Sequence, residues 1–339
     1  MLPPRIVRRL FVAPLVALGG LVLIVLFPIV VLIALAYDLL DRHGLRATRL
    51  ATLVFLITVY EVAGLLALLL LWIVSGFGLA MKTSPMQRAH VGLSRWWLNG
   101  VTRSIRGLLG VRISYEQQTR ATGPVMVFSR HGGPADSVFL ARTLLVEFSR
   151  QPRIVAKREL QWAPFMDTVC NRLPNHFVDR KPKDRQHELD AIEQLAASID
   201  DTGALILFPE GGNFTARRRD RAIASLRGKG NKTQAAWATQ MPNLIAPRPG
   251  GALAAMRGAP AAEVVFVAHS GLEDLQSVRD IWEALPLNRT LKGHYWRTTP
   301  EERPTDLDQQ VAWLYRWWAQ IDLWIEKNRP EDVTPAPPV

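Results

Sequence analysis

The sequence of 339 residues contains very little cysteine and histidine, and this scarcity excludes several classes of protein. Cys170 is the single cysteine, so no disulfide can form within the chain and a disulfide-stapled secreted domain is excluded. The seven histidines include no His-Glu-x-x-His sequence, and we expect no metal site. No Gly-x-Ser-x-Gly segment occurs, which argues against an α/β-hydrolase.

Charge is nearly missing from the first quarter of the chain. Leu10–Tyr37 has no charged residue, and Leu50–Met81 has only Glu61. A bilayer-spanning helix needs roughly 20 apolar residues, so both segments are long enough. The short polar linker Asp38–Arg49 between them predicts a two-helix membrane hairpin, with helices over about 10–37 and 50–81. Nothing after Met81 is apolar for as long, which excludes a polytopic channel.

The distribution of positive charge predicts the orientation of this hairpin. The N-terminal tail and residues 82–112 together carry more Lys and Arg than the linker does. Under the positive-inside rule, both ends of the hairpin are cytoplasmic, and the protein is multi-pass with its following domain on the cytoplasmic face. Arginine far outnumbers lysine, which indicates high-GC coding and favours a bacterial plasma membrane.

Two features of this region have more than one interpretation. Glu61 lies inside the second apolar segment, where an ionisable group is by default functional, but Val62–Ala80 alone is long enough to span. We favour a span that begins after Glu61. Residues 86–112 have tryptophans and arginines at helical spacing, which fits a helix on an anionic membrane surface or one packed on the domain core.

The rest of the chain has an α/β pattern, in which short apolar runs alternate with helical periodicity. This alternation predicts a largely parallel β-sheet flanked by helices, following the membrane hairpin. The expected domains are a hydrophobic region over 1–85, an α/β domain over 86–330 and a disordered Pro-rich tail over 331–339. The expected strands are Val125–Phe128, Arg153–Ala156, Ala204–Phe208, Leu244–Ala246 and Glu263–Ala268. The expected helices are Ser137–Phe148, Asp184–Ile199 and Leu307–Asn328.

Two expected strands end in polar, glycine-rich segments, VMVFSRHGGPAD (125–136) and ALILFPEGGNF (204–214). In the first, a tight turn would bring Asp136 back onto the imidazole of His131. An aspartate on one ring nitrogen fixes the tautomer, and the other nitrogen can then take a proton from an attacking hydroxyl. In the second, Pro209 and Gly211 make a rigid loop that would present Glu210 into the site.

The spacing of His131 and Asp136 does not by itself identify the catalytic pair. His269 and Asp274 have the same spacing and also follow an expected strand. Spacing alone leaves both pairs as candidates.

The order of these segments resembles the glycerolipid (1-acylglycerol-3-phosphate) acyltransferase superfamily. His-x-x-x-x-Asp near a strand end is followed by Phe-Pro-Glu-Gly some eighty residues later. RIVAKRELQWAP (153–164) resembles the family's Lys-x-x-Leu-x-x-x-Pro stretch, and Phe177–Arg180 resembles its second motif. LIAPRPGG (244–251) resembles its fourth motif, and the combination is most similar to the lysocardiolipin/lysophosphatidylinositol acyltransferase branch.

The resemblance implies a membrane-bound O-acyltransferase that moves a fatty acyl group from acyl-CoA or acyl carrier protein to a lysophospholipid hydroxyl. It makes His131 and Asp136 the catalytic pair, because the family's pair precedes Phe-Pro-Glu-Gly, and leaves His269 as a structural histidine. Lys157 would serve the oxyanion or the donor. No bound cofactor is implied beyond the thioester co-substrate. The acceptor would be held by Asp179, Arg180, Glu210 and Gly211, and the motifs would be supported by Phe208, Pro209 and Pro247.

One departure from the family pattern concerns the acceptor. Gly212 and Asn213 follow Phe-Pro-Glu-Gly where a threonine and a cation are usual. Either another arginine substitutes, or the headgroup is not a simple phosphomonoester; a glycolipid, an amine-bearing lipid or a non-catalytic lipid-binding role are alternatives. The basic run over 217–232 fits anionic lipid or coenzyme A phosphates better than nucleic acid, because no nucleic-acid module is visible.

Overall fold

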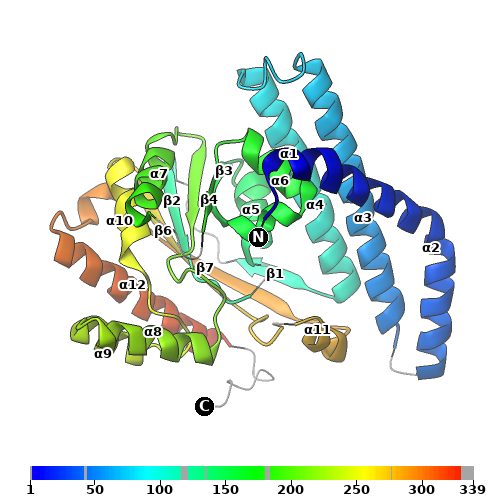
Figure 1. Cartoon of the computed structure of the whole chain (residues 1–339). Coiled ribbons are helices and arrows are strands. Elements are labelled where there is room, and N and C mark those ends of the chain that lie inside the picture. Colours follow the sequence, from blue (N-terminus) through cyan, green and yellow to red (C-terminus); the bar gives the residue numbers. More distant parts are fainter. Residues whose placement is uncertain are drawn as a thin grey trace.

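The computed structural model describes residues 2–41, 44–115, 121–133, 136–179, 184–275 and 277–329. Its centre is a seven-stranded sheet in the order β1-β7-β6-β2-β5-β3-β4, flanked by helices (Figure 1). The strands are β1 (Arg112–Tyr115), β2 (Val125–Ser129), β3 (Gln151–Lys157), β4 (His176–Val178), β5 (Gly203–Leu207), β6 (Glu263–Ser270) and β7 (Thr290–Thr298). The expected mixed α/β architecture with a mostly parallel sheet is confirmed.

The strands β6, β2, β5, β3 and β4 run parallel to one another, while β7 is antiparallel to β6. In the register of the sheet, Phe128 of β2 lies between Leu207 of β5 and Phe266 of β6. The carboxyl ends of these neighbouring strands therefore meet at one edge. The polar segments that follow β2 and β5 are brought together there, as is general for parallel sheets.

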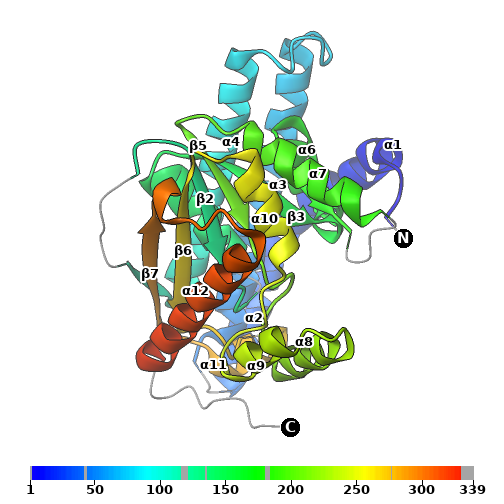
Figure 2. The same cartoon turned by 90° about the vertical axis from the view of Figure 1, so that its left-hand side faces the viewer.

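Side chains that alternate along the strands build one core on each face of the sheet. Met126, Phe128 and Phe266 pack against α7, α10 and α12 on one face, and Val125 and Val127 pack against α4, α5 and α6 on the other. Figure 2 shows α10 and α12 in front of the sheet with α3 and α4 behind it. Both faces are covered, which explains the continuous apolar runs of β2 and β5.

The helices account for most of the remaining described chain. They are α1 (Arg5–Val7), the π-helical turn η1 (Arg8–Val12), α2 (Ala13–Asp41), α3 (Arg46–Val74), α4 (Ser84–Leu109), α5 (Asp136–Arg142), the π-helical turn η2 (Thr143–Glu147), the 3₁₀ turn η3 (Arg158–Trp162), α6 (Pro164–Arg172), α7 (Arg185–Ala197), α8 (Ala216–Gly228), α9 (Lys232–Thr239), α10 (Pro249–Gly258), α11 (Val278–Ala284), the 3₁₀ turn η4 (Pro300–Glu302) and α12 (Leu307–Asn328). The expected tail lies in residues 330–339, which fall outside the described residues.

The two apolar segments form the helices α2 and α3, and both are long and apolar enough to cross a membrane. Apolar side chains of α2 are exposed along its length at the outer edge of the molecule (Figure 1). The helix α3 packs on the domain: a Cβ at Gly64 would lie only 2.6 Å from the ring of Phe165, so glycine allows this close approach. Glu61 accepts a hydrogen bond from the Phe165 amide (2.9 Å), which gives this carboxylate a structural partner at the start of α6.

Two expected elements differ in the structure. The second apolar helix ends at Val74 rather than near Met81, because the glycine-containing segment after it turns and leads into α4. Leu244–Ala246 is a buried loop rather than a strand: the Ile245 amide donates to the carboxylate of Glu210 instead of to a neighbouring strand. The prolines at 247 and 249 fit this loop conformation.

Candidate active site

His131 follows β2, and its main chain is fixed on both sides by the segment that follows β5. The His131 amide donates to Glu210 Oε1 (2.9 Å), and the His131 carbonyl accepts from the Phe214 amide (2.7 Å). The ring of Phe208 packs against the imidazole, with centroids 4.6 Å apart. The Phe-Pro-Glu-Gly segment thus places the histidine by direct contacts.

Asp136 is the first residue of α5, and the turn from β2 brings it back to His131. Its Oδ2 atom accepts a hydrogen bond from the Gly133 amide (2.5 Å) and lies 3.6 Å from His131 Nδ1. Burial opposes ionisation of Asp136, but the neighbouring imidazoles of His269 and His131 and the hydrogen bond from the Gly133 amide together lower its pKa. The carboxylate is therefore placed to hold His131 in the tautomer whose Nε2 is free to accept a proton.

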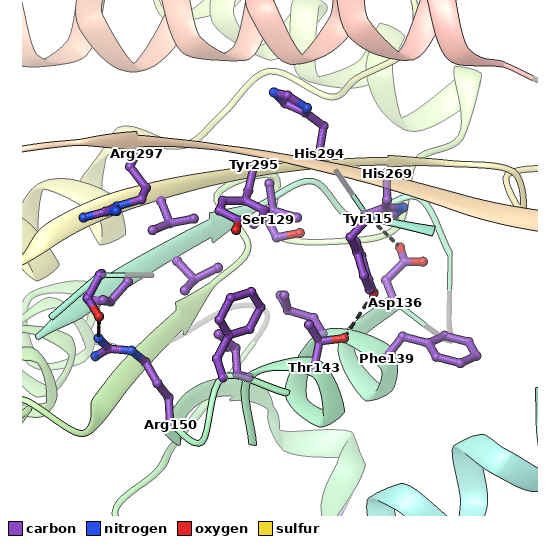
Figure 3. Close-up of a pocket in the computed structure, with 18 of the residues that line it drawn as sticks. Tyr115, Ser129, Asp136, Phe139, Thr143, Arg150, His269, His294, Tyr295 and Arg297 are labelled. Carbon is purple, nitrogen blue, oxygen red and sulfur yellow. Dashed lines mark hydrogen bonds and ion pairs between the residues drawn. The ribbon is translucent and has the colours of Figure 1, made fainter. Parts of the chain in front are cut away.

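A second histidine, which the sequence leaves as structural, reaches the same carboxylate. His269, near the end of β6, has its Nε2 atom 3.5 Å from Asp136 Oδ2 (Figure 3). Its sequence neighbour Asp274 instead forms an ion pair with Arg289 at 2.5 Å. His269 and Asp274 therefore do not form a second His–Asp pair. No local pattern in the sequence signals the contact between His269 and Asp136, since it joins a residue of β6 to a residue of α5 that is distant in the chain.

Lys157 ends β3 and reaches the open nitrogen of His131. Its Nζ atom lies 3.4 Å from His131 Nε2 and 3.5 Å from Asn213 Oδ1. The side of the imidazole that must meet a hydroxyl therefore also has a positive charge beside it. Asn213, one of the two departures from the family pattern, takes part in this arrangement.

Glu210 is buried, with 1% of its surface exposed, and both of its oxygens accept hydrogen bonds from main-chain amides. Oε1 accepts from His131 and Oε2 from Ile245 (3.2 Å). Burial raises the pKa of Glu210 to about 7, while Arg130 acts in the opposite direction. These contacts give Glu210 a role in positioning the loop that carries His131. The supporting prolines lie beside it: the Pro209 carbonyl accepts from the Arg248 amide (2.9 Å), and Pro247 is buried.

Arginines surround the glycines of this loop. Gly211 has φ +71°, a conformation that favours glycine, and a Cβ there would lie 3.3 Å from the guanidinium of Arg248. Arg218 lies beside Gly212 and donates to the Asn213 carbonyl (3.0 Å). Two cations that the sequence motif alone does not identify therefore flank the altered Gly212–Asn213 segment.

Asp179 and Arg180 are the acceptor-binding residues expected from the second motif, and the structure describes Asp179. Asp179 forms an ion pair with Arg158 at 2.8 Å, and both side chains are about half exposed. Arg180, the arginine expected to bind the acceptor, lies outside the described residues. Arg158 directly follows Lys157, so this ion pair links the second motif to the lysine that faces His131.

An apolar pocket that Asp136 helps to line lies between the sheet and the α5–η2 segment. Figure 3 shows Asp136 and His269 at one end of the pocket and Arg150 and Arg297 at the other. Between these ends the lining is aliphatic and aromatic. The apolar residues are Ala121, Val125, Val127, Phe139, Leu140, Leu144, Phe148, Val265, Val267 and Leu291.

Comparison with known proteins agrees with this geometry. The model of the family described as Acyltransferase matches residues 110–271, the stretch that contains His131, Asp136, Lys157 and Glu210.

A short segment of the chain is also similar to a curated protein. The chain is 33% identical over 94 residues to a lysophosphatidylcholine acyltransferase of Drosophila melanogaster. The matched segment is 27% of this chain and 16% of that relative, so the chain covers less than a fifth of the relative's length. No solved structure matches.

Proposed function

We propose that the acyltransferase domain transfers a fatty acyl group from an acyl thioester, acyl-CoA or acyl carrier protein, to the hydroxyl of a lysophospholipid such as 1-acylglycerol-3-phosphate. The observation that carries this proposal is His131, held by Glu210 and Asp136 beside an apolar pocket. The family match and the lysophospholipid named for the fly relative support the same class of reaction.

The proposed reaction requires only His131 and the groups around its imidazole. The acceptor hydroxyl gives its proton to His131 Nε2, and its oxygen attacks the thioester carbon. Asp136, facing Nδ1, stabilises the imidazolium that forms. The tetrahedral intermediate then collapses, the carbon–sulfur bond breaks, and the imidazolium returns the proton to the leaving thiolate. Lys157 is placed to stabilise the oxyanion, and one such donor is worth about 3–4 kcal/mol.

The pocket beyond Asp136 gives an acyl chain a place outside water. Its lining is apolar between the polar groups at its two ends. Burying one methylene group contributes about 0.8 kcal/mol, so binding a chain there would add substantially to substrate affinity. We propose that one acyl chain of the reacting lipids lies in this pocket.

The decisive experiment measures product from purified full-length protein. The protein is incubated with a labelled acyl-CoA and a panel of lysophospholipids, a lysoglycolipid and an amine-bearing lipid, and the products are identified by mass. We expect a diacyl phospholipid as the main product. Transfer only to a glycolipid or an amine would move the assignment to that acceptor, and lipid binding with no transfer would overturn the catalytic proposal.

We propose that Arg218 and Arg248 bind the phosphate of the acceptor in place of the cation missing at Asn213. Replacing either with alanine should raise KM for a phosphate-bearing lysolipid roughly tenfold, since a charge-assisted hydrogen bond contributes about 1.5–3 kcal/mol. KM is measured by initial rates at saturating donor. Arg279→Ala, which removes an exposed arginine on α11, is the matched control. An unchanged KM in both variants would mean that other groups bind the headgroup.

For the membrane we propose that the α2–α3 hairpin lies in one leaflet beside the domain, on the cytoplasmic face. Near its start, α3 contacts the domain through Arg46, which donates to the Leu285 carbonyl (2.9 Å). Toward its other end, the Leu68 carbonyl accepts from Arg172 (2.7 Å). With 29 residues, α3 is about 43 Å long, which exceeds the roughly 30 Å thickness of the hydrocarbon core. If α3 crossed the bilayer, its two ends would lie on opposite sides of the membrane, and a single domain could not contact both.

This arrangement replaces the two-span topology expected from hydropathy, and cysteine labelling tests it. Cys170 is buried, and burial raises its pKa to about 12, so it should stay unlabelled at neutral pH. In sealed vesicles, an impermeant maleimide should label Leu45→Cys, in the linker, and His187→Cys, on α7, from the same side. Labelling of the two positions from opposite sides would restore the two-span hairpin.

A further inference from the structure

His269 contacts the carboxylate that serves the candidate base, and it approaches the same oxygen as His131 does. Asp136 Oδ2 lies 3.5 Å from His269 Nε2 and 3.6 Å from His131 Nδ1. The side chain of Asp136 is only 4% exposed, so protein groups rather than water must satisfy and orient it. One oxygen of the carboxylate therefore faces two imidazoles, one from the segment after β2 and one from β6.

The surroundings of His269 determine which of its nitrogens carries hydrogen. Besides Asp136, the Nε2 atom faces the carbonyl oxygen of Arg130 at 3.4 Å. Both neighbours only accept hydrogen bonds, so Nε2 is the protonated nitrogen of this ring. Burial lowers the pKa of His269, while Asp136 acts in the opposite direction. The neutral ring is thus a fixed N–H donor aimed at Asp136.

A buried ion pair keeps the main chain of His269 in place. Arg130 Nη1 donates to the His269 carbonyl (2.6 Å) and to Glu273 Oε1 (2.8 Å). Glu273 in turn accepts from the Gly271 amide (2.7 Å). The end of β6 is therefore bound to the residue that directly precedes His131.

We infer that His269 is a positioning residue for acyl transfer: its Nε2–H holds the Asp136 carboxylate in the orientation in which it faces His131 Nδ1. The inference rests on the proposed function. The ring of His269 also lines the apolar pocket, as Asp136 does. Without this donor, Asp136 would keep the Gly133 amide as its anchor but lose its contact with His269.

The test uses two replacements of similar size. His269→Gln keeps an N–H group near the position of Nε2, and His269→Met removes it. We expect kcat of His269→Met to fall roughly 10–100-fold, as is typical when a group that orients a reacting residue is removed, with KM for both substrates within about twofold of wild type. His269→Gln should recover most of kcat. His187→Met, which alters an exposed histidine on α7, is the control.

A double-mutant cycle separates positioning from packing. In the Asp136→Asn background, His269→Met should cost no more than about twofold further, because the residue that it positions has already been changed. Equal activity of wild type and His269→Met, or a loss that multiplies fully with Asp136→Asn, would overturn the positioning role while the acyltransferase assignment stands. If His269→Met does not fold, an inactive His269→Gln overturns it instead. A wild-type protein that transfers no acyl group would overturn both proposals.

Discussion

Replacing His131 with alanine should reduce acyl transfer roughly 10³-fold or more, because general base catalysis by a positioned side chain contributes about 10²–10⁴-fold. No other described side chain could replace His131 as the base: Asp136 is held by the Gly133 amide, and Lys157 approaches from the side of Nε2 as a cation. The loss should appear in kcat, since the imidazole acts on the reacting hydroxyl rather than on the headgroup. Initial rates with labelled acyl-CoA and lysophospholipid measure it.

The fold should survive this substitution, which makes the result interpretable. The main-chain contacts of His131 with Glu210 and Phe214 do not use its imidazole. Thermal unfolding in detergent should therefore change by only a few degrees. His187→Ala, on the exposed face of α7, should keep full activity. Activity of His131→Ala within tenfold of wild type would remove His131 from the mechanism and with it the proposed reaction.

The second large effect is expected for Glu210→Gln. An amide side chain offers one acceptor oxygen, so its NH₂ group would face the amide of either His131 or Ile245, both of which now donate to Glu210. A buried donor without a partner costs about 1–3 kcal/mol. We expect lower thermal stability and a roughly 10²–10³-fold loss of kcat, since a displacement of about 1 Å at a reacting group can cost 10²-fold.

The control for Glu210→Gln is Glu193→Gln, which removes a carboxylate that forms an exposed ion pair with Arg257. That variant should keep wild-type stability and rate. If Glu210 instead binds the acceptor directly, its replacement should raise KM for the lysolipid and leave the unfolding temperature unchanged. This pattern would contradict the role assigned from the main-chain contacts.

The raised pKa of Glu210 adds a pH dependence. Its value of about 7 lies above the ordinary carboxyl range, so folding favours the protonated form. The contribution of this group to stability is therefore present below its ordinary pKa and is lost as pH rises through about 7. The ionised form, with two acceptor oxygens for the two amides, should nevertheless be the better support for His131. Ionisation of Glu210 between pH 6 and 8 should therefore raise kcat of the wild type. This rise in kcat should be smaller in Glu210→Gln, whose side chain does not ionise.

Much of the site could be predicted because its residues lie in local patterns. The apolar runs of β2 and β5 are continuous, since both faces of the sheet are covered, and each ends in a distinctive polar segment. Two such segments in a parallel sheet must meet at the carboxyl ends of their strands. Pattern and family resemblance together therefore predict that His131, Asp136 and Glu210 lie near one another.

Local sequence patterns do not predict some other elements, because the conformation of these segments depends on contacts with residues that are distant in the chain. The edge strands β1 and β4 have three or four residues and half-buried side chains, so they show no clear apolar run. Leu244–Ala246 has the composition of a strand, yet the Ile245 amide bonds to the buried Glu210. An apolar triplet alone does not reveal whether its main-chain donors meet a strand or a carboxylate.

The sequence by itself determined the apolar segments and the mixed α/β class, because these depend on composition and periodicity, and its family resemblance selected His131 and Asp136 as the candidate pair. Only the tertiary structure decided which groups surround them. His269 reaches Asp136 because β6 lies next to β2 in the sheet, and Glu210 holds His131 because β5 lies on its other side. Contacts between neighbouring strands depend on strand order, which chain spacing does not encode.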